Sequence, residues 1–135
     1  MADIGTVIDA VEAAFRAEAR GDVTMPPKTY VDLGDVNGDF RSMPARVGDD
    51  AGVKWVNVHP DNPDRFGLPT VMGLVIFSDI ETGYPVALLD GTVLTRLRTG
   101  AAAGVATRHL ADPAASTLGI LGAGQQARTQ LAAVD

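Results

Sequence analysis

The sequence TLGIL at residues 117–121, followed by GAGQQA at residues 122–127, decides the fold expected for this chain. The apolar run predicts a strand, and Gly-x-Gly-x-x-Ala predicts a turn from that strand into a helix. Gly122 permits the tight turn, Gly124 lets backbone N–H groups approach a pyrophosphate, and Ala127 lets the helix pack closely. The segment is therefore typical of the phosphate-binding turn of a dinucleotide site.

This turn lies close to the end of the chain, which finishes at Asp135. A βαβ unit needs about 30 residues or more. We therefore expect residues 113–135 to be the incomplete start of an NAD-binding Rossmann domain. Residues 1–112 are then expected to form a separate domain.

The first helix is expected over residues 3–20, where apolar side chains recur at three- and four-residue steps. Gly21 is its expected C-terminal cap. The apolar stripe consists of Ile4, Val7, Ile8, Val11 and Phe15.

The middle of the chain predicts strands joined by hairpin turns. Turn chemistry at residues 35–39 indicates that the runs on either side of it pair with each other. The expected strands cover residues 28–33, 40–47, 52–59, 70–78 and 84–89. The fold class is therefore α/β: an α+β N-terminal domain with a mostly antiparallel sheet, followed by the truncated Rossmann start.

A connecting helix is expected over residues 92–110, and its centre is made of glycine and alanine at residues 100–104. Two glycines inside a helix cost roughly 1 kcal/mol each relative to alanine. We therefore expect something to approach the helix closely at this point, either another backbone or a ligand.

Composition narrows the function classes. The chain has no cysteine, and its only histidines are His59 and His109, so neither a disulfide framework nor a metal site is expected. The net charge of −6 comes without a basic patch, which argues against nucleic acid. No apolar run reaches the roughly 20 residues of a membrane span. Asp3 and Asp9 stand where a signal peptide would be apolar or basic, so a cytoplasmic protein is expected.

Four cations are candidates for chemistry: Lys28, Arg41, Lys54 and Arg98. Lys54 has apolar neighbours on both sides, and a buried lysine with a lowered pKa serves as an acid or base. The alternative is that it points outward from an alternating strand. Arg98 is able to make a bidentate pair with a carboxylate or phosphate, or else lies on a solvated helix face.

Two further features stay open on sequence grounds. Thr99 either donates its hydroxyl to a phosphate or bonds back to its own helix. The polar segment at residues 57–63 either lines a cleft or is a plain surface loop. Arg96 is expected on a solvated helix face.

These segments together resemble the ornithine cyclodeaminase and mu-crystallin family, and within it the archaeal-type alanine dehydrogenases. The resemblance runs from about Met25 to the end of the chain. It rests on MPPK at 25–28, RSMPA at 41–45, KWVN at 54–57 with His59-Pro60, GLPTV at 67–71, LRTGAA at 97–102 and GAGQQA at 122–127.

The resemblance implies a role for each candidate residue. Lys54 and Lys28 would be catalytic, acting in proton transfer. Substrate would be bound by Arg41, Lys54, Thr70 and Arg98. The dinucleotide would be bound by Arg98, Thr99, Gly122, Ala123, Gly124, Gln125 and Gln126.

The activity that this resemblance implies is NAD-dependent oxidation of L-alanine to pyruvate and ammonia. The alternatives are cyclisation of L-ornithine to L-proline with loss of ammonia, and a non-catalytic mu-crystallin-like binding or dimerisation module. NADP also stays open, because the acidic residue that separates it from NAD lies about 20 positions beyond the glycine turn. The resemblance further implies a homodimer built through the N-terminal domain. We expect the 135-residue chain alone to be inactive.

Overall fold

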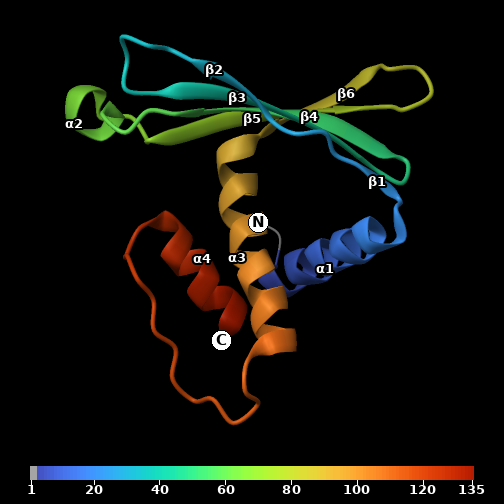
Figure 1. Cartoon of the computed structure of the whole chain (residues 1–135), viewed down its shortest axis with the longest axis vertical. Coiled ribbons are helices and arrows are strands. Elements are labelled where there is room, and N and C mark those ends of the chain that lie inside the picture. Colours follow the sequence, from blue (N-terminus) through green and yellow to red (C-terminus); the bar gives the residue numbers. More distant parts are fainter. Residues whose placement is uncertain (1–2) are drawn as a thin grey trace. The chain divides into compact units, whose positions relative to one another are not determined.

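The structure, a computed structural model, describes residues 3–135 (Figure 1). The helices are α1 (Ile4–Arg20), α2 (Asn62–Phe66), α3 (Gly91–Leu110) and α4 (Gln125–Val134). The strands are β1 (Val23–Thr24), β2 (Thr29–Asp32), β3 (Asp39–Val47), β4 (Asp50–Val58), β5 (Val71–Ser78) and β6 (Pro85–Asp90).

The chain divides into two compact units, Ala17–Thr92 and Met1–Arg16 with Val93–Asp135. The first unit contains the strands and α2, and the second contains α4 with most of α1 and α3. The domain boundary expected near residue 112 stays a prediction.

The strands form one antiparallel sheet in the order β1-β3-β4-β5-β6, and β2 pairs with β3 beside β1. Every strand expected between residues 28 and 89 is present, with bounds that shift by one or two residues. The expected fold class, helices with a mostly antiparallel sheet, is therefore confirmed.

The hairpin expected around residues 35–39 is also confirmed, and it sets the register of the sheet's first strands. Asp32 pairs with Asp39, and Tyr30 pairs with Arg41. On the far side of β3, Arg41 pairs with Val56. Because residues paired directly across a ladder share a face, this register determines which side chains meet.

The apolar stripe that the periodicity predicts on α1 packs against α3. Ile8 is buried together with Ala101 and Val105 of α3, and further apolar side chains lie partly buried around them. Those side chains are Ile4, Val7, Val11 and Ala133. Phe15 does not follow the expectation, because it is 49% exposed near the end of the stripe. Gly21 ends α1 with φ 81°, as a C-terminal glycine cap requires.

The glycines of α3 are explained by the close approach of a second backbone. A Cβ placed at Gly100 would lie 2.6 Å from the carbonyl oxygen of Thr129, and one at Gly104 would lie 2.7 Å from that of Ala133. Both carbonyls belong to α4. Of the two sequence alternatives, another backbone is the one observed.

One local expectation is wrong, and one open question is decided. Residues 117–121 form no strand, since no strand among residues 3–135 pairs with them, and an apolar run becomes a strand only with a partner. For residues 57–63, where the sequence leaves two alternatives open, a plain loop is not observed, because α2 begins at Asn62. Pro63 in the first turn and Gly67, with φ 65° at the C-terminus, are its start and stop signals.

Candidate functional site

Within Ala17–Thr92, the sheet brings three of the predicted cations to one face. Arg41 and Met43 alternate along β3, and Met43 pairs with Lys54 on β4. Lys54 pairs in turn with Val75 on β5. Because alternate residues and directly paired residues share a face, Arg41 and Lys54 lie on the same side of the sheet. The cross-strand partners of Lys54 are apolar, and Lys54 itself is half-buried rather than buried.

Arg41 is held by Asp39, two residues earlier on the same strand. Its Nε donates to Asp39 Oδ1 at 2.7 Å, and its Nη2 donates to Asp39 Oδ2 at 2.9 Å. The side chains are 27% and 26% exposed, so the pair is partly shielded from water. The hydrogen bonds lower the pKa of the Asp39 carboxyl and raise the pKa of Arg41. Both groups therefore stay charged around neutral pH.

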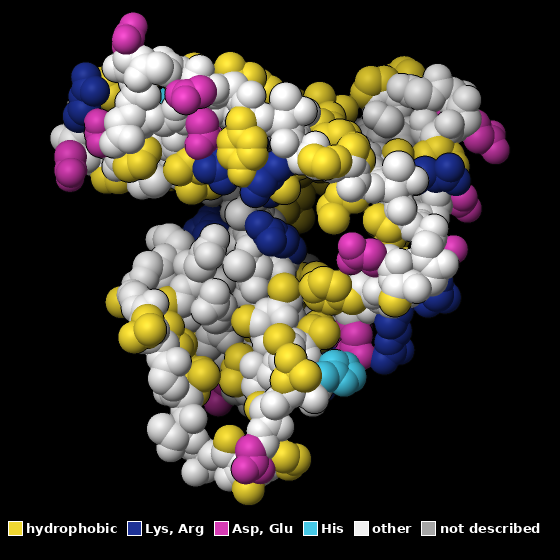
Figure 2. Space-filling model, viewed as in Figure 1, with side chains coloured by type: hydrophobic (Ala, Val, Ile, Leu, Met, Phe, Trp, Pro, Cys, Tyr) yellow, Lys and Arg dark blue, Asp and Glu magenta, His cyan; other side chains and the backbone are white. Residues whose placement is uncertain are grey.

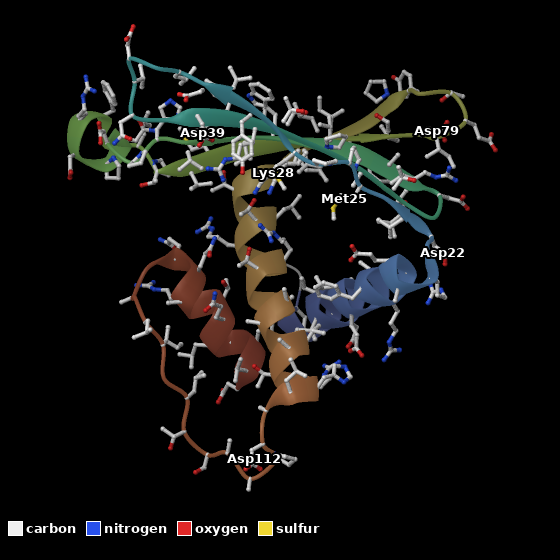
Figure 3. The ribbon with its side chains drawn as sticks, viewed as in Figure 1. Asp22, Met25, Lys28, Asp39, Asp79 and Asp112 are labelled. Carbon is white, nitrogen blue, oxygen red and sulfur yellow. The ribbon has the colours of Figure 1, made fainter. Side chains whose placement is uncertain are left out.

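Tyr30 lies beside two cations of this group. Its ring centroid is 5.1 Å from Cζ of Arg41 and 5.4 Å from Nζ of Lys28. Such distances allow a cation–π attraction. Figure 3 labels Asp39 on β3 and Lys28 in the segment just before β2. The face thus offers a cluster of positive charge in which Asp39 is the acidic member bonded to Arg41.

Thr70 immediately precedes β5 and is half-buried. Its carbonyl accepts a 2.8 Å hydrogen bond from the backbone N–H of His59, which continues the pairing of β4 with β5. A hollow of about 580 Å³ lies beside the turn between β2 and β3 and the C-terminal end of β4, and its lining includes Tyr30, Asp39 and Pro60. The hollow borders the Arg41 pair but is not lined by Arg41 or Lys54.

The opposite face of the sheet carries aromatic and apolar side chains. Phe40 stacks on Trp55 with ring centroids 5.3 Å apart, and its ring meets that of His59 edge-on at 5.5 Å. Asn57 Nδ2 lies 3.0 Å from His59 Nδ1. Asn57 and His59, both from the polar segment at residues 57–63, therefore contact each other.

The second unit contains the glycine turn. Gly122 has φ 96°, the left-handed conformation expected of the tight turn, and Gly124 is the N-cap of α4. A Cβ at either glycine would meet no atom of the described residues within 4 Å. No side chain of residues 3–135 caps α4, although the Ala127 N–H donates to the Gly124 carbonyl at 3.1 Å. The remaining N–H groups at this helix N-terminus suit an anion. The turn thus fits the phosphate-binding role that its sequence predicts.

Other predicted residues of this unit lie on α3. Arg98 is exposed. Thr99 Oγ1 donates to the Thr95 carbonyl at 2.7 Å, the second of the alternatives left open for this hydroxyl. Arg96 was expected on a solvated face, yet its Nη1 donates to Gln125 Oε1 of the glycine turn at 3.2 Å. Arg96 is thus a residue that the sequence alone did not select.

Two findings concern the rest of the described chain. Residues 3–135 include no cluster of three or more His, Asp or Glu side chains arranged to hold a metal ion. None of the helices in that range combines the length and the apolar character needed to cross a membrane.

Comparison with known proteins identifies the family. The model of the ornithine cyclodeaminase/mu-crystallin family matches residues 2–135. The chain belongs to this family. It is 51% identical over 127 residues to the alanine dehydrogenase of Archaeoglobus fulgidus, a match that covers 94% of this chain and 38% of that protein.

Solved structures of the family agree with this fold. An archaeal alanine dehydrogenase dimer with bound NAD superposes with a TM-score of 0.94 at 49% identity, covering 98% of this chain and 41% of that one. The Δ1-pyrroline-2-carboxylate reductase of Thermococcus litoralis, in complex with NADH and L-proline, also gives 0.94, at 41% identity and with 98% and 42% covered. The chain thus spans about two fifths of the length of these relatives.

Proposed function

We propose that this chain is the substrate-binding and dimerisation portion of an NAD-dependent amino-acid dehydrogenase that acts on L-alanine. The observation that carries the proposal is the shared sheet face of Arg41 and Lys54, with Lys28 beside the same tyrosine as Arg41. A cationic face of this kind suits the carboxylate that every α-amino acid carries. The 51% identity to an alanine dehydrogenase supports alanine as the substrate.

In this proposal the sheet residues hold the substrate and move protons. Arg41, with Arg98, binds the substrate carboxylate, and Thr70 lines the pocket. NAD would supply the acceptor for the hydride of the α-carbon, so that the substrate, with its amine deprotonated, becomes an iminium. Water then adds to the iminium carbon, and Lys54 Nζ, which enters this step as the neutral amine, takes up a proton from that water, with Lys28 assisting. Lys54 then returns the proton to the substrate nitrogen. Loss of ammonia yields pyruvate.

The proposed dinucleotide residues are Arg98, Thr99, Gly122, Ala123, Gly124, Gln125 and Gln126. The open N-terminus of α4 supports the glycine turn as the pyrophosphate contact. The NAD and NADH in the two solved relatives support NAD over NADP. Residues 1–112 would then bind substrate, and residues 113–135 would begin the NAD-binding domain.

Ornithine cyclodeamination is the second candidate, because the family includes both activities. The test uses a protein in which this chain is continued by a complete NAD-binding domain. With L-alanine we expect NADH and pyruvate to accumulate together. Conversion of ornithine to proline consumes no net NAD, so proline formed without NADH would favour the cyclodeaminase. Absence of turnover with either amino acid would refute both candidates.

We also propose that the protein forms a homodimer through the sheet face opposite Arg41. Large apolar side chains on that face are well exposed, and Figure 2 shows hydrophobic side chains along the sheet. They include Val31, Trp55, Leu74, Ile76 and Leu88, each between 39% and 65% exposed. Exposed apolar area of this kind marks an interaction site. The alanine dehydrogenase relative is itself a dimer.

Light scattering tests the dimer. We expect Trp55→Glu to lower the molar mass from that of a dimer to that of a monomer, since it puts a charge at the centre of the apolar face. Tyr84→Ser is the matched control, because Tyr84 is 69% exposed but lies in the turn before β6. A wild-type monomer, or a dimeric Trp55→Glu variant, would refute this interface.

A further inference from the structure

The two hydrogen bonds between Asp39 and Arg41 determine which edge of the guanidinium is left for a ligand. Asp39 takes the Nε hydrogen and one hydrogen of Nη2. An arginine has five N–H donors in a rigid fork. The edge formed by Nη1 and the outer hydrogen of Nη2 is therefore the one left for a second carboxylate. A substrate carboxylate would meet Arg41 end-on.

The orientation of this edge is set from two sides. Asp39 and Arg41 are alternate residues of β3, so the two side chains leave the same strand on the same face. Tyr30 is paired directly with Arg41 across the β2–β3 ladder, and its ring lies 5.1 Å from Cζ. One contact lies in the plane of the guanidinium and the other is with an aromatic ring. Together they restrict a side chain that is otherwise rich in rotamers.

We propose that Asp39 is a positioning residue, which with Tyr30 presents the Nη1–Nη2 edge of Arg41 to a substrate carboxylate. The inference rests on the proposed function only in that the ligand is an α-amino or α-keto acid. A preorganised arginine binds a carboxylate more tightly than a mobile one, because less conformational entropy is lost on binding. The bidentate geometry and partial burial separate this pair from an ordinary exposed ion pair, which contributes little.

The direct test is carboxylate binding to the 135-residue chain, followed by the ¹⁵N NMR signal of Arg41 Nε. Pyruvate and L-alanine are the probes, and isopropylamine is the probe that lacks a carboxylate. We expect a saturable shift with the carboxylates and none with the amine. Asp39→Asn should weaken binding about tenfold, since one charge-assisted hydrogen bond is lost.

Asp32→Asn is the matched control. Asp32 pairs directly with Asp39 on the neighbouring strand, and its Oδ1 accepts from the N–H of Gly34 rather than from Arg41. If Asp39 acted only through its negative charge, both variants would change binding alike. We expect Asp32→Asn to bind pyruvate within twofold of the wild type. Asp39→Glu keeps the charge but shifts the oxygens, and it should bind at an intermediate level.

A double-mutant cycle separates positioning from folding. Lysine lacks the fork that Asp39 holds. In an Arg41→Lys background we therefore expect Asp39→Asn to cause little further loss. Three outcomes would overturn the inference. Wild type and Asp39→Asn bind the carboxylates with equal affinity, the Arg41 Nε signal does not respond to either carboxylate, or the effects of the two substitutions in the cycle are fully additive. Thermal unfolding of each variant identifies any that do not fold, and Asp39→Glu then takes the place of Asp39→Asn.

In the active enzyme, in which a complete NAD-binding domain follows this chain, Asp39→Asn should raise KM for L-alanine about tenfold with little change in kcat. KM for NAD should stay unchanged. Activity with alanine but an unaltered KM in Asp39→Asn would refute the positioning role while the proposed function stands. Carboxylate binding that depends on Asp39, without turnover of any amino acid, would refute the proposed function and leave the positioning role in place.

Discussion

Replacing Gly100 by alanine tests whether α4 is docked on α3 as the backbone contacts indicate. The added Cβ would lie 2.6 Å from the Thr129 carbonyl oxygen and 2.7 Å from its carbon. An ordinary contact needs roughly 0.8 Å more than this, and both obstructing atoms are backbone, so α4 as a whole must move.

The expected magnitude follows from two opposing effects. Alanine in a helix interior is favoured over glycine by about 1 kcal/mol. Overpacking against atoms that cannot yield costs about 1–3 kcal/mol. We expect the clash to prevail, so that Gly100→Ala lowers the free energy of unfolding by about 1–2 kcal/mol. Hydrogen exchange of the α4 amides should accelerate at the same time.

Gly5→Ala is the matched control, since Gly5 is also a helical glycine, near the start of α1. Its Cβ would meet only the carboxylate of Asp3, at 3.0 Å, and no backbone atom. This exposed side chain is able to move, although its Oδ2 accepts the hydrogen bond from the Thr6 N–H at the start of α1. The gain of about 0.5–1 kcal/mol from replacing a helical glycine is offset by strain on this capping hydrogen bond, so we expect a net change within about 1 kcal/mol. Urea unfolding measures both variants. If Gly100→Ala proved as stable as Gly5→Ala, with α4 amides still protected, the docking of α4 on α3 would be refuted.

Three further predictions follow from single residues. In the enzyme with a complete NAD-binding domain, Lys54→Met should lower kcat by about 10²–10⁴-fold without lowering Tm, because a positioned acid–base group contributes that much to the rate. A near-normal kcat would show that Lys54 takes no part in proton transfer. The pKa of Glu12 is lowered chiefly by its hydrogen bond with His109. The contribution of Glu12 to stability is therefore present above the usual glutamate pKa and is lost as the pH falls through the lowered value, so the free energies of unfolding of wild type and Glu12→Gln should converge in acid. A difference between these two free energies that does not change with pH would contradict this. Gly38→Ala should destabilise by about 1–3 kcal/mol, as its Cβ would lie 2.8 Å from the His59 ring, and a melting temperature equal to that of wild type would show that the ring moves aside.

Several features were determined by the sequence alone because the signals that specify them are local. Apolar spacing predicts α1, and its terminal glycine predicts where the helix stops. Turn chemistry at residues 35–39 predicts the β2–β3 hairpin. The Gly-x-Gly-x-x-Ala motif predicts a turn with positive φ at Gly122, followed by a helix. Each of these features depends on residues within one or two turns of the chain.

The candidate site was predicted only in part. Arg41 and Lys54 were identifiable as unusual cations, but their common face follows from a register that pairs Met43 with Lys54. The sequence carries a signal for Asp39 as well, namely an acidic residue two positions before Arg41 on an expected strand. Tyr30 had no such signal, because its place beside Arg41 depends on the pairing of another strand.

Tertiary structure alone decided the remaining features, because they depend on partners that are distant in sequence. The run at residues 117–121 has strand composition, but strand formation requires a neighbouring strand, and none among residues 3–135 pairs with it. The glycines of α3 predict that another group approaches this helix closely. Only the packing of α4 shows that the group is a second backbone. The hydroxyl of Thr99 likewise had two options, and the position of the Thr95 carbonyl decided between them. Arg96 was expected on a solvated face, and the position of Gln125 gives its guanidinium a partner instead.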